Sequence, residues 1–138
     1  MDHKHLIVRA KVMTPPTVCS VIDTWLIELV EKLGMKITKG PISSYVTKKG
    51  NEGLTAAVLI TAAVLIQTSH IAIHVWDNSS PALIQLDVYS CSDFKVQDVF
   101  NHLSTFSPVM LQYKFLDRDE DLIEIEGGIL NGTDRIER

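Results

Sequence analysis

One short region of the chain concentrates side chains that could carry out covalent chemistry. It contains a hydroxyl (Ser69), two imidazoles (His70 and His74) and a thiol (Cys91). A hydroxyl or thiol becomes a nucleophile or proton donor when a base stands beside it, and an imidazole exchanges protons near neutral pH. Together these are the groups needed to break a peptide bond and to build a catalytic carbonyl.

Strand alternation decides which of these groups share a face. The segments around His74 and before Cys91 are apolar and β-branched, so they read as strands whose side chains alternate between two faces. His74 then shares a face with His70, and Cys91 shares one with Tyr89. Antiparallel pairing would bring His74 toward the strand of Cys91. The two imidazoles lie on the order of 13 Å apart along a strand, too far to share an ion, so no metal site is expected.

The rest of the chain predicts a sheet and two helices to hold this region. Apolar residues recur at strand or helix spacing between turn signals. The expected strands are 5–12, 35–38, 42–47, 54–67, 70–76, 82–90 and 109–116, and the expected helices are 17–33 and 94–106. This pattern predicts an α+β fold, a two-layer α/β sandwich whose mainly antiparallel sheet is covered on one face by the helices. Residues 1–116 form that domain, and 117–138 form an acidic, glycine-containing tail with a possible edge strand at 122–125.

A six-residue repeat precedes the reactive region. Thr55-Ala56-Ala57-Val58-Leu59-Ile60 is followed at once by Thr61-Ala62-Ala63-Val64-Leu65-Ile66. Because side chains change face at every residue, both copies present the same residues to the core and the register signal is degenerate. A continuous strand over 54–67 would span roughly 46 Å, longer than ordinary strands, so one copy is expected to bulge, bend or protrude.

Bulk properties exclude several classes of protein. The chain has 138 residues and a formal charge of -4, so it carries no basic surplus for nucleic acid or an anionic membrane. Its longest apolar run, 54–66, is shorter than the roughly 20 residues of a membrane helix. Two cysteines far apart and the absence of a secretory leader favour a reducing, cytoplasmic location.

The segment from Ser69 to Cys91 resembles the self-processing segment of the S-adenosylmethionine decarboxylase family. That family carries a Ser-His-x-x-Ile-His-x-Trp run followed by an Asp-Val-aromatic-x-Cys run, and both are present here at 69–76 and 87–91. The resemblance extends from His5 to about Leu116 and is most specific between Ser69 and Cys91.

The resemblance implies an enzyme that makes its own cofactor. The chain would cleave itself between Thr68 and Ser69, and Ser69 would become a pyruvoyl group that holds a small-molecule amine substrate as a Schiff base while carbon dioxide leaves. His74 would move a proton during processing, Cys91 would be the proton donor in decarboxylation, and Thr61 would support processing. The implied substrate is S-adenosylmethionine, used for spermidine biosynthesis, and the implied active form is a homodimer.

Several positions depart from the family pattern and keep other interpretations open. Thr68 stands where the family has glutamate, and Thr55 in the first repeat copy competes with Thr61. Asp77 is a shifted substitute for the glutamate that contacts the ribose. Where the family stacks adenine this chain has no ring, and Tyr45 is the nearest candidate. The alternatives are the same chemistry on ornithine or arginine, and an unprocessed, non-catalytic homologue with a binding or regulatory role.

Overall fold

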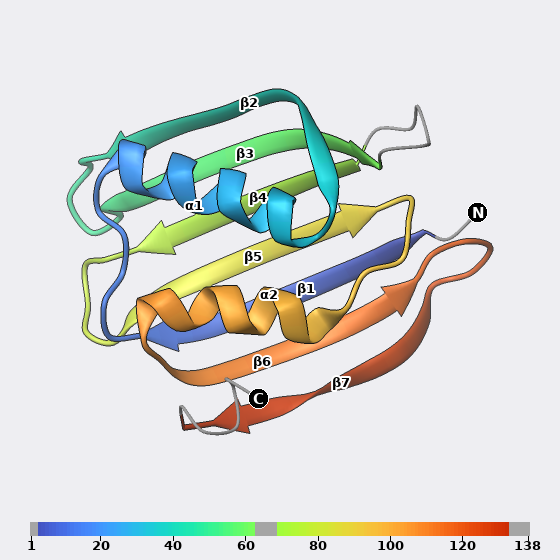
Figure 1. Ribbon diagram of the computed structural model, residues 1–138. Coiled ribbons are helices and arrows are strands. Elements are labelled where there is room, and N and C mark those ends of the chain that lie inside the picture. Colours follow the sequence, from blue (N-terminus) through green and yellow to red (C-terminus); the bar gives the residue numbers. More distant parts are fainter. Residues whose placement is uncertain (1–2, 63–68, 133–138) are drawn as a thin grey trace.

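The computed structural model describes residues 3–62 and 69–132, which form one antiparallel sheet with two helices packed on it. The strands are β1 (Lys4–Val12), β2 (Met35–Val46), β3 (Gly53–Ala62), β4 (Ser69–Trp76), β5 (Ala82–Ser90), β6 (Pro108–Asp117) and β7 (Ile123–Asn131), and the helices are α1 (Cys19–Lys32), α2 (Val96–Leu103) and the short 3-10 helix η1 (Ser104–Phe106). The strand order is β2-β3-β4-β5-β1-β6-β7. Both long helices lie on the same face of the sheet (Figure 1). The predicted two-layer α+β sandwich is therefore confirmed.

Alternating apolar residues form the core between the sheet and the helices. Every second residue of β1 is buried, and α1 buries one apolar stripe against the sheet. The β1 residues are Leu6, Val8, Ala10 and Val12, and the α1 residues are Ile22, Trp25, Leu26, Leu29 and Val30. A fully buried aliphatic side chain contributes about 1.5–3 kcal/mol. The helix ends because Gly34 adopts a φ of 70°, a left-handed conformation that glycine adopts without strain.

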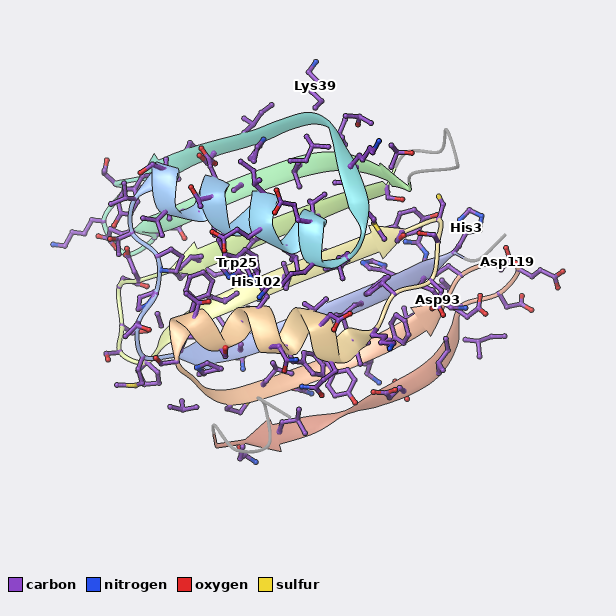
Figure 2. All side chains as sticks on the ribbon, in the orientation of Figure 1. His3, Trp25, Lys39, Asp93, His102 and Asp119 are labelled. Atoms are coloured by element: carbon purple, nitrogen blue, oxygen red, sulfur yellow. The ribbon has the colours of Figure 1, made fainter. Side chains whose placement is uncertain are left out.

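A reciprocal contact joins the two helices. The Trp25 indole Nε1 donates to the His102 carbonyl at 3.1 Å, and His102 Nε2 lies 2.7 Å from the Trp25 carbonyl. The two rings stack with centroids 4.6 Å apart, and Figure 2 shows them side by side between α1 and α2. Since a carbonyl only accepts, His102 carries a proton on Nε2. The helix layer is thereby held together by polar as well as apolar contacts.

Several element boundaries differ from the predicted ones. The two strands expected at 35–38 and 42–47 are one strand, β2, whose pairing with β3 shifts register on either side of Lys39. The second helix is shorter than 94–106 because its last turn is the 3-10 helix η1. The edge strand expected at 122–125 is longer and pairs with β6 as β7. The first repeat copy lies in β3, whereas residues 63–68, including Thr68, lie outside the described residues.

The opposite face of the sheet carries polar and aromatic side chains. Residues that alternate with the buried ones point there, among them His70 and His74 on β4 and Asp87 and Tyr89 on β5. Neither helix covers this face, which we call the open face (Figure 1). No helix formed by residues 3–62 or 69–132 is long and apolar enough to cross a membrane.

Candidate active site

The structure brings Ser69 and Cys91 together. Ser69 opens β4 and is 2% exposed, and Cys91 directly follows β5 and is 7% exposed. Their strands are antiparallel neighbours with His70 opposite Tyr89, so β4 begins where β5 ends. The Cys91 backbone N–H donates to Ser69 Oγ at 2.9 Å. Residues separated by 22 positions thus meet because of strand register.

Aromatic and charged groups lie beside this pair on the open face, whereas Ser69, which alternates with His70, lies on the covered side of the sheet. Tyr89 lies between its cross-strand neighbours His5 and His70. The His70 ring stacks on Tyr89 at 5.5 Å, the His5 ring meets it edge-on at 6.0 Å, and the Arg118 guanidinium lies 4.8 Å from its centroid. We call Ser69 and Cys91, with His3, His5, His70, Asp87, Tyr89 and Arg118, the Ser69 cluster.

Hydrogen bonds determine the tautomer of His5. Arg118 Nη1 lies 3.1 Å from His5 Nδ1, and His5 Nε2 lies 2.8 Å from Asp87 Oδ1. Because a guanidinium only donates, Nδ1 accepts and Nε2 carries the proton that is donated to the carboxylate. His5 therefore links two charged side chains inside the cluster.

Two groups in the cluster have perturbed protonation equilibria. Burial lowers the pKa of His70, its electrostatic interaction with His5 acts in the same direction, and Asp87 opposes the shift. Burial raises the pKa of Tyr89, the neighbouring Cys91 thiol adds to the rise, and Arg118 opposes it. His70 thus favours its neutral form and Tyr89 keeps its proton.

A second group of predicted residues gathers at the other end of β4. His74 Nδ1 lies 3.3 Å from Thr55 Oγ1 on the paired strand β3, and its ring stacks on Trp76 at 5.9 Å. Trp76 Nε1 donates to Asn51 Oδ1 at 2.9 Å. These residues border a shallow pocket of about 210 Å³. Together with Tyr45 and Asp77 they form what we call the His74 cluster.

The two candidate substrate residues contact each other. The Tyr45 hydroxyl lies 3.1 Å and 2.9 Å from the two carboxylate oxygens of Asp77. This hydrogen bond raises the pKa of Tyr45, and the negative charge of Asp77 adds to the effect. The aromatic ring and the carboxylate, predicted separately, form one polar unit at the edge of the His74 cluster.

The two clusters are separate within one chain. Ser69 and His74 are five positions apart on the same strand, a separation of roughly 16 Å. Thr61 pairs with Lys36 and follows Ile60, the residue opposite Ser69, whereas Thr55 is opposite His74. Within one protomer, the structure brings Cys91 but not His74 to Ser69.

Sequence reasoning missed part of the Ser69 cluster. Tyr89 is the aromatic of the Asp-Val-aromatic-x-Cys run, so its place beside Cys91 was readable, but its contacts with His3 and His5 were not. Arg118 follows β6, 113 positions from His5, and nothing in the local pattern marks it. Within residues 3–62 and 69–132, no three His, Cys, Asp or Glu side chains are arranged to hold a metal ion.

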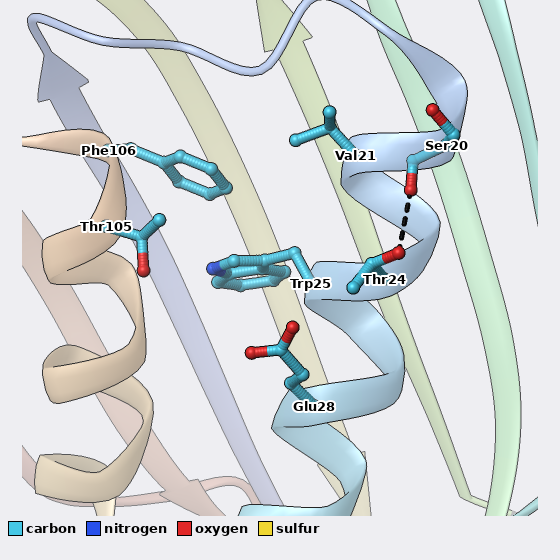
Figure 3. A pocket seen from close by; sticks show the side chains of 7 residues that line it. All are labelled: Ser20, Val21, Thr24, Trp25, Glu28, Thr105 and Phe106. Carbon is cyan, nitrogen blue, oxygen red and sulfur yellow. Dashed lines mark hydrogen bonds between the residues drawn. The ribbon is translucent and has the colours of Figure 1, made fainter.

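Away from the open face, a pocket of about 370 Å³ lies between α1 and η1. Figure 3 shows Trp25, Phe106 and Glu28 among its lining residues. It contains none of the predicted site residues. This pocket is therefore not part of either cluster.

The fold and the two clusters define the class of this protein: an α+β domain in which a buried serine at the start of one strand accepts a hydrogen bond from the backbone of a cysteine at the end of the neighbouring strand. A protein-family model described as S-adenosylmethionine decarboxylase matches residues 5–119. The chain belongs to this family. The matched region contains every residue of both clusters except His3. Enzymes of the family are decarboxylases and generally depend on a pyruvoyl group.

Proposed function

We propose that this chain is a cytoplasmic, pyruvoyl-dependent decarboxylase of S-adenosylmethionine that serves spermidine biosynthesis. Its active form arises by self-cleavage between Thr68 and Ser69. The observation that carries the proposal is the 2.9 Å hydrogen bond from the Cys91 backbone to Ser69 Oγ. It places the proposed precursor of the carbonyl beside the proposed proton donor, and both are buried.

The residues at this position fit a pyruvoyl group made from Ser69. Its hydroxyl is withdrawn from water and accepts from the Cys91 backbone N–H. Elimination would remove this oxygen with residue 68, so the same N–H would then be available to the keto oxygen of the group formed there. When present, the group supplies an electron sink that lets an amine substrate lose carbon dioxide. The Cys91 thiol, at the same strand end, would donate the proton that replaces the lost carboxylate.

Processing requires Ser69 Oγ to attack the carbonyl carbon of Thr68. This acyl shift breaks the C–N bond, forms a C–O ester bond and gives the amide nitrogen the hydroxyl proton. β-Elimination would then take a proton from the Ser69 α-carbon and expel the residue-68 carboxylate from the β-carbon, which cuts the chain. Water would replace the nitrogen on the α-carbon, with release of ammonia, and leave the keto group. His74 is proposed to carry protons in this sequence, because an imidazole gains and loses them near neutral pH. Its Nδ1 is oriented by the Thr55 hydroxyl at 3.3 Å. Thr55 thus has a specific contact for a supporting role, and Thr61, closer along β3 to Ser69, stays a candidate.

We propose that a second copy of the chain supplies His74 to Ser69. The roughly 16 Å between the two residues on one strand is too long for direct proton transfer. The open face carries the His74 side chain, and neither helix covers it. Packing of two open faces about a twofold axis would bring the His74 cluster of each copy toward the open-face members of the other copy's Ser69 cluster, at the end of β4 where Ser69 lies. The homodimer would then contain two composite sites.

Intact mass tests the covalent event directly. Purified wild-type protein should yield two fragments that separate before Ser69, the second blocked by a carbonyl. The Ser69→Ala variant should remain a single 15.4 kDa chain. Ser79→Ala, which removes an exposed loop hydroxyl, is the matched control and should be cleaved like the wild type. A wild-type chain that stays whole after prolonged incubation contradicts the proposal and favours the non-catalytic homologue.

The identity of the substrate needs a separate test. Tyr45, the nearest candidate for the missing adenine-stacking ring of the family, is hydrogen-bonded to Asp77. A phenol beside a carboxylate suits the basic side chain of ornithine or arginine. Release of labelled carbon dioxide should be fastest with S-adenosylmethionine. Faster release from ornithine or arginine would keep the chemistry and change the substrate.

A further inference from the structure

The Tyr89 hydroxyl lies between a surface histidine and the buried thiol. His3 Nδ1 is 2.8 Å from the Tyr89 oxygen, and a side-chain hydrogen bond joins Tyr89 to Cys91. On its other side, His3 Nε2 lies 3.9 Å from Asp119 Oδ1. His3 and Asp119 lie at the same end of the molecule, where Figure 2 labels them. A continuous chain of polar atoms therefore leads from the surface to Cys91.

The exposures along this chain show why such a connection is useful. The His3 and Asp119 side chains are 26% and 47% exposed, whereas Cys91 is 7% exposed. A thiol that gives up its proton in each cycle must regain one, and burial restricts its direct contact with water. Tyr89 and His3 connect the surface to the buried Cys91 thiol, so a proton can reach the sulfur without water entering the core.

The side chains around Tyr89 fix the orientation of its phenol ring. Tyr89 is stacked against His70 and covered by Arg118. Within residues 3–62 and 69–132, the charged or titratable groups that face Tyr89 come from the segments at β1, β4, β5 and β6. They are His3 before β1, His5 on β1, His70 on β4, Asp87 on β5, Cys91 after β5, and Arg118 and Asp119 after β6.

We propose that Tyr89 and His3 return a proton to Cys91 after each decarboxylation. The inference rests on the proposed function, because Cys91 must first lose its proton to the substrate carbon. The Tyr89 O–H then protonates the sulfur, His3 Nδ1–H protonates the phenolate oxygen, and His3 Nε2 takes a proton from water beside Asp119. Tyr89 and His3 act through Cys91 without touching the substrate, so they are positioning residues.

Because Tyr89 has only one phenolic proton, the hydrogen bonds from His3 through Tyr89 to Cys91 can run in only one direction at a time. If Tyr89 donates to sulfur, its oxygen must accept from His3, and Nδ1 must carry the imidazole proton. If Nε2 carries the only proton, Tyr89 donates to Nδ1 and has none left for the thiol. The tautomer of neutral His3 therefore decides between a chain that feeds Cys91 and one that leads away from it.

Nitrogen-15 NMR of the imidazoles can read this tautomer in the wild-type protein whether or not the chain is cleaved. Spectra at pH 8 are assigned to His3 with His3→Gln. We expect His3 to carry its proton on Nδ1, and Tyr89→Phe to remove that preference. Tyr113→Phe removes a hydroxyl that bonds Glu126 on β7 and should leave His3 unchanged. A wild-type His3 protonated on Nε2, or one indifferent to Tyr89→Phe, overturns the proposal.

Steady-state kinetics give a second readout on processed protein. Tyr89→Phe should lower kcat about tenfold or more while leaving KM unchanged, because reprotonation contributes to turnover and not to binding. The Tyr113→Phe control should keep wild-type values. A Tyr89→Phe enzyme with wild-type kcat overturns the proposal that Tyr89 and His3 return the proton to Cys91. Intact mass reports cleavage independently, so an uncut protein with the Nδ1 tautomer contradicts the proposed function and leaves the hydrogen-bond chain standing.

Discussion

The two faces of the sheet differ in the kind of side chain that they carry. Under the helices, apolar side chains interdigitate, and the polar pair Trp25 and His102 satisfies itself. On the open face, histidines, tyrosines and acidic groups form two clusters separated along β4. Neither helix encloses those clusters.

This difference separates the parts of the molecule that fold it from those that react. On the covered face, buried apolar side chains stabilise the fold. Substitutions there are costly because the core is closely packed, and this packing needs no second protein copy. The open face, together with Ser69 on the other side of β4, holds groups whose proposed function needs them within hydrogen-bond reach of each other. One chain achieves this for Ser69 and Cys91 but not for Ser69 and His74. The predictions below test this division.

The largest expected effect comes from separating the two clusters onto different chains. Ser69→Ala and His74→Ala alone should each lower processing by at least about 100-fold, since each lacks one half of every site. Coexpressed, they should regain about a quarter of wild-type active sites, because half of random dimers are mixed and each mixed dimer has one complete site. Measured by intact mass, only the His74→Ala chain should be cleaved.

The same mixture distinguishes sites shared between copies from sites within one chain. If His74 acts on Ser69 of its own chain, mixing two defective chains restores nothing. Coexpression of Ser69→Ala with the double variant Ser69→Ala/His74→Ala is the control, because it has no serine to cleave. If the coexpressed Ser69→Ala and His74→Ala chains stay uncut while the wild-type protein is cleaved, the composite site shared between two copies is ruled out.

On the covered face the expected effect is on stability. His102→Ala removes a buried ring, its stack on Trp25 and its hydrogen bond to a carbonyl, so it should lower the free energy of unfolding by about 2–4 kcal/mol. His70→Ala on the open face should cost less than about 1 kcal/mol, as expected for an exposed site. Urea unfolding of both variants measures the contrast. Equal costs would mean that the open face also stabilises the fold.

Much of this covered face could be predicted from the sequence, because periodicity reports burial. The alternation in β1 and the helical spacing in α1 depend only on which residues are apolar. The sequence could not show that residues 35–46 form one strand, since Gly40-Pro41 reads as a break. Nor could it show the full length of β7, whose residues are nearly all exposed and whose alternation of apolar and polar residues stops at Gly127-Gly128.

The site was less predictable, because its contacts depend on register. The sequence places the reactive groups on neighbouring strands, but a shift of two residues would exchange their partners without changing their faces. Only the structure shows that Tyr89 is opposite His70 and that His74 is opposite Gln85. The repeat adds a specific ambiguity, since Thr55 and Thr61 occupy equivalent places in identical hexamers.

That ambiguity leads to a smaller effect within the open face. Thr55 contacts His74, whereas the strand pairing places Thr61 opposite Lys36. Thr55→Val should slow processing about tenfold, the expected effect of losing about 1.4 kcal/mol from a hydrogen bond that orients the imidazole. Thr61→Val is the matched control and should slow it less. The time course of fragment formation gives both rates, and the reverse order would assign the supporting role to Thr61.

The smallest effect expected is the pH dependence of the covered face. Burial lowers the pKa of His102, the charge of Lys32 adds to the shift, and the Trp25 carbonyl opposes it. Below about pH 6.5 the unfolded chain therefore binds a proton at this site that the folded chain does not. The free energy of unfolding should fall as pH falls from about 6.5 toward 5, and His102→Gln should flatten this slope. Asn101→Ala on the same helix should keep the wild-type slope, because it removes no titratable group. A His102→Gln slope identical to the wild type would show that the pH response comes from the open face, where His70 has a pKa lowered in the same direction.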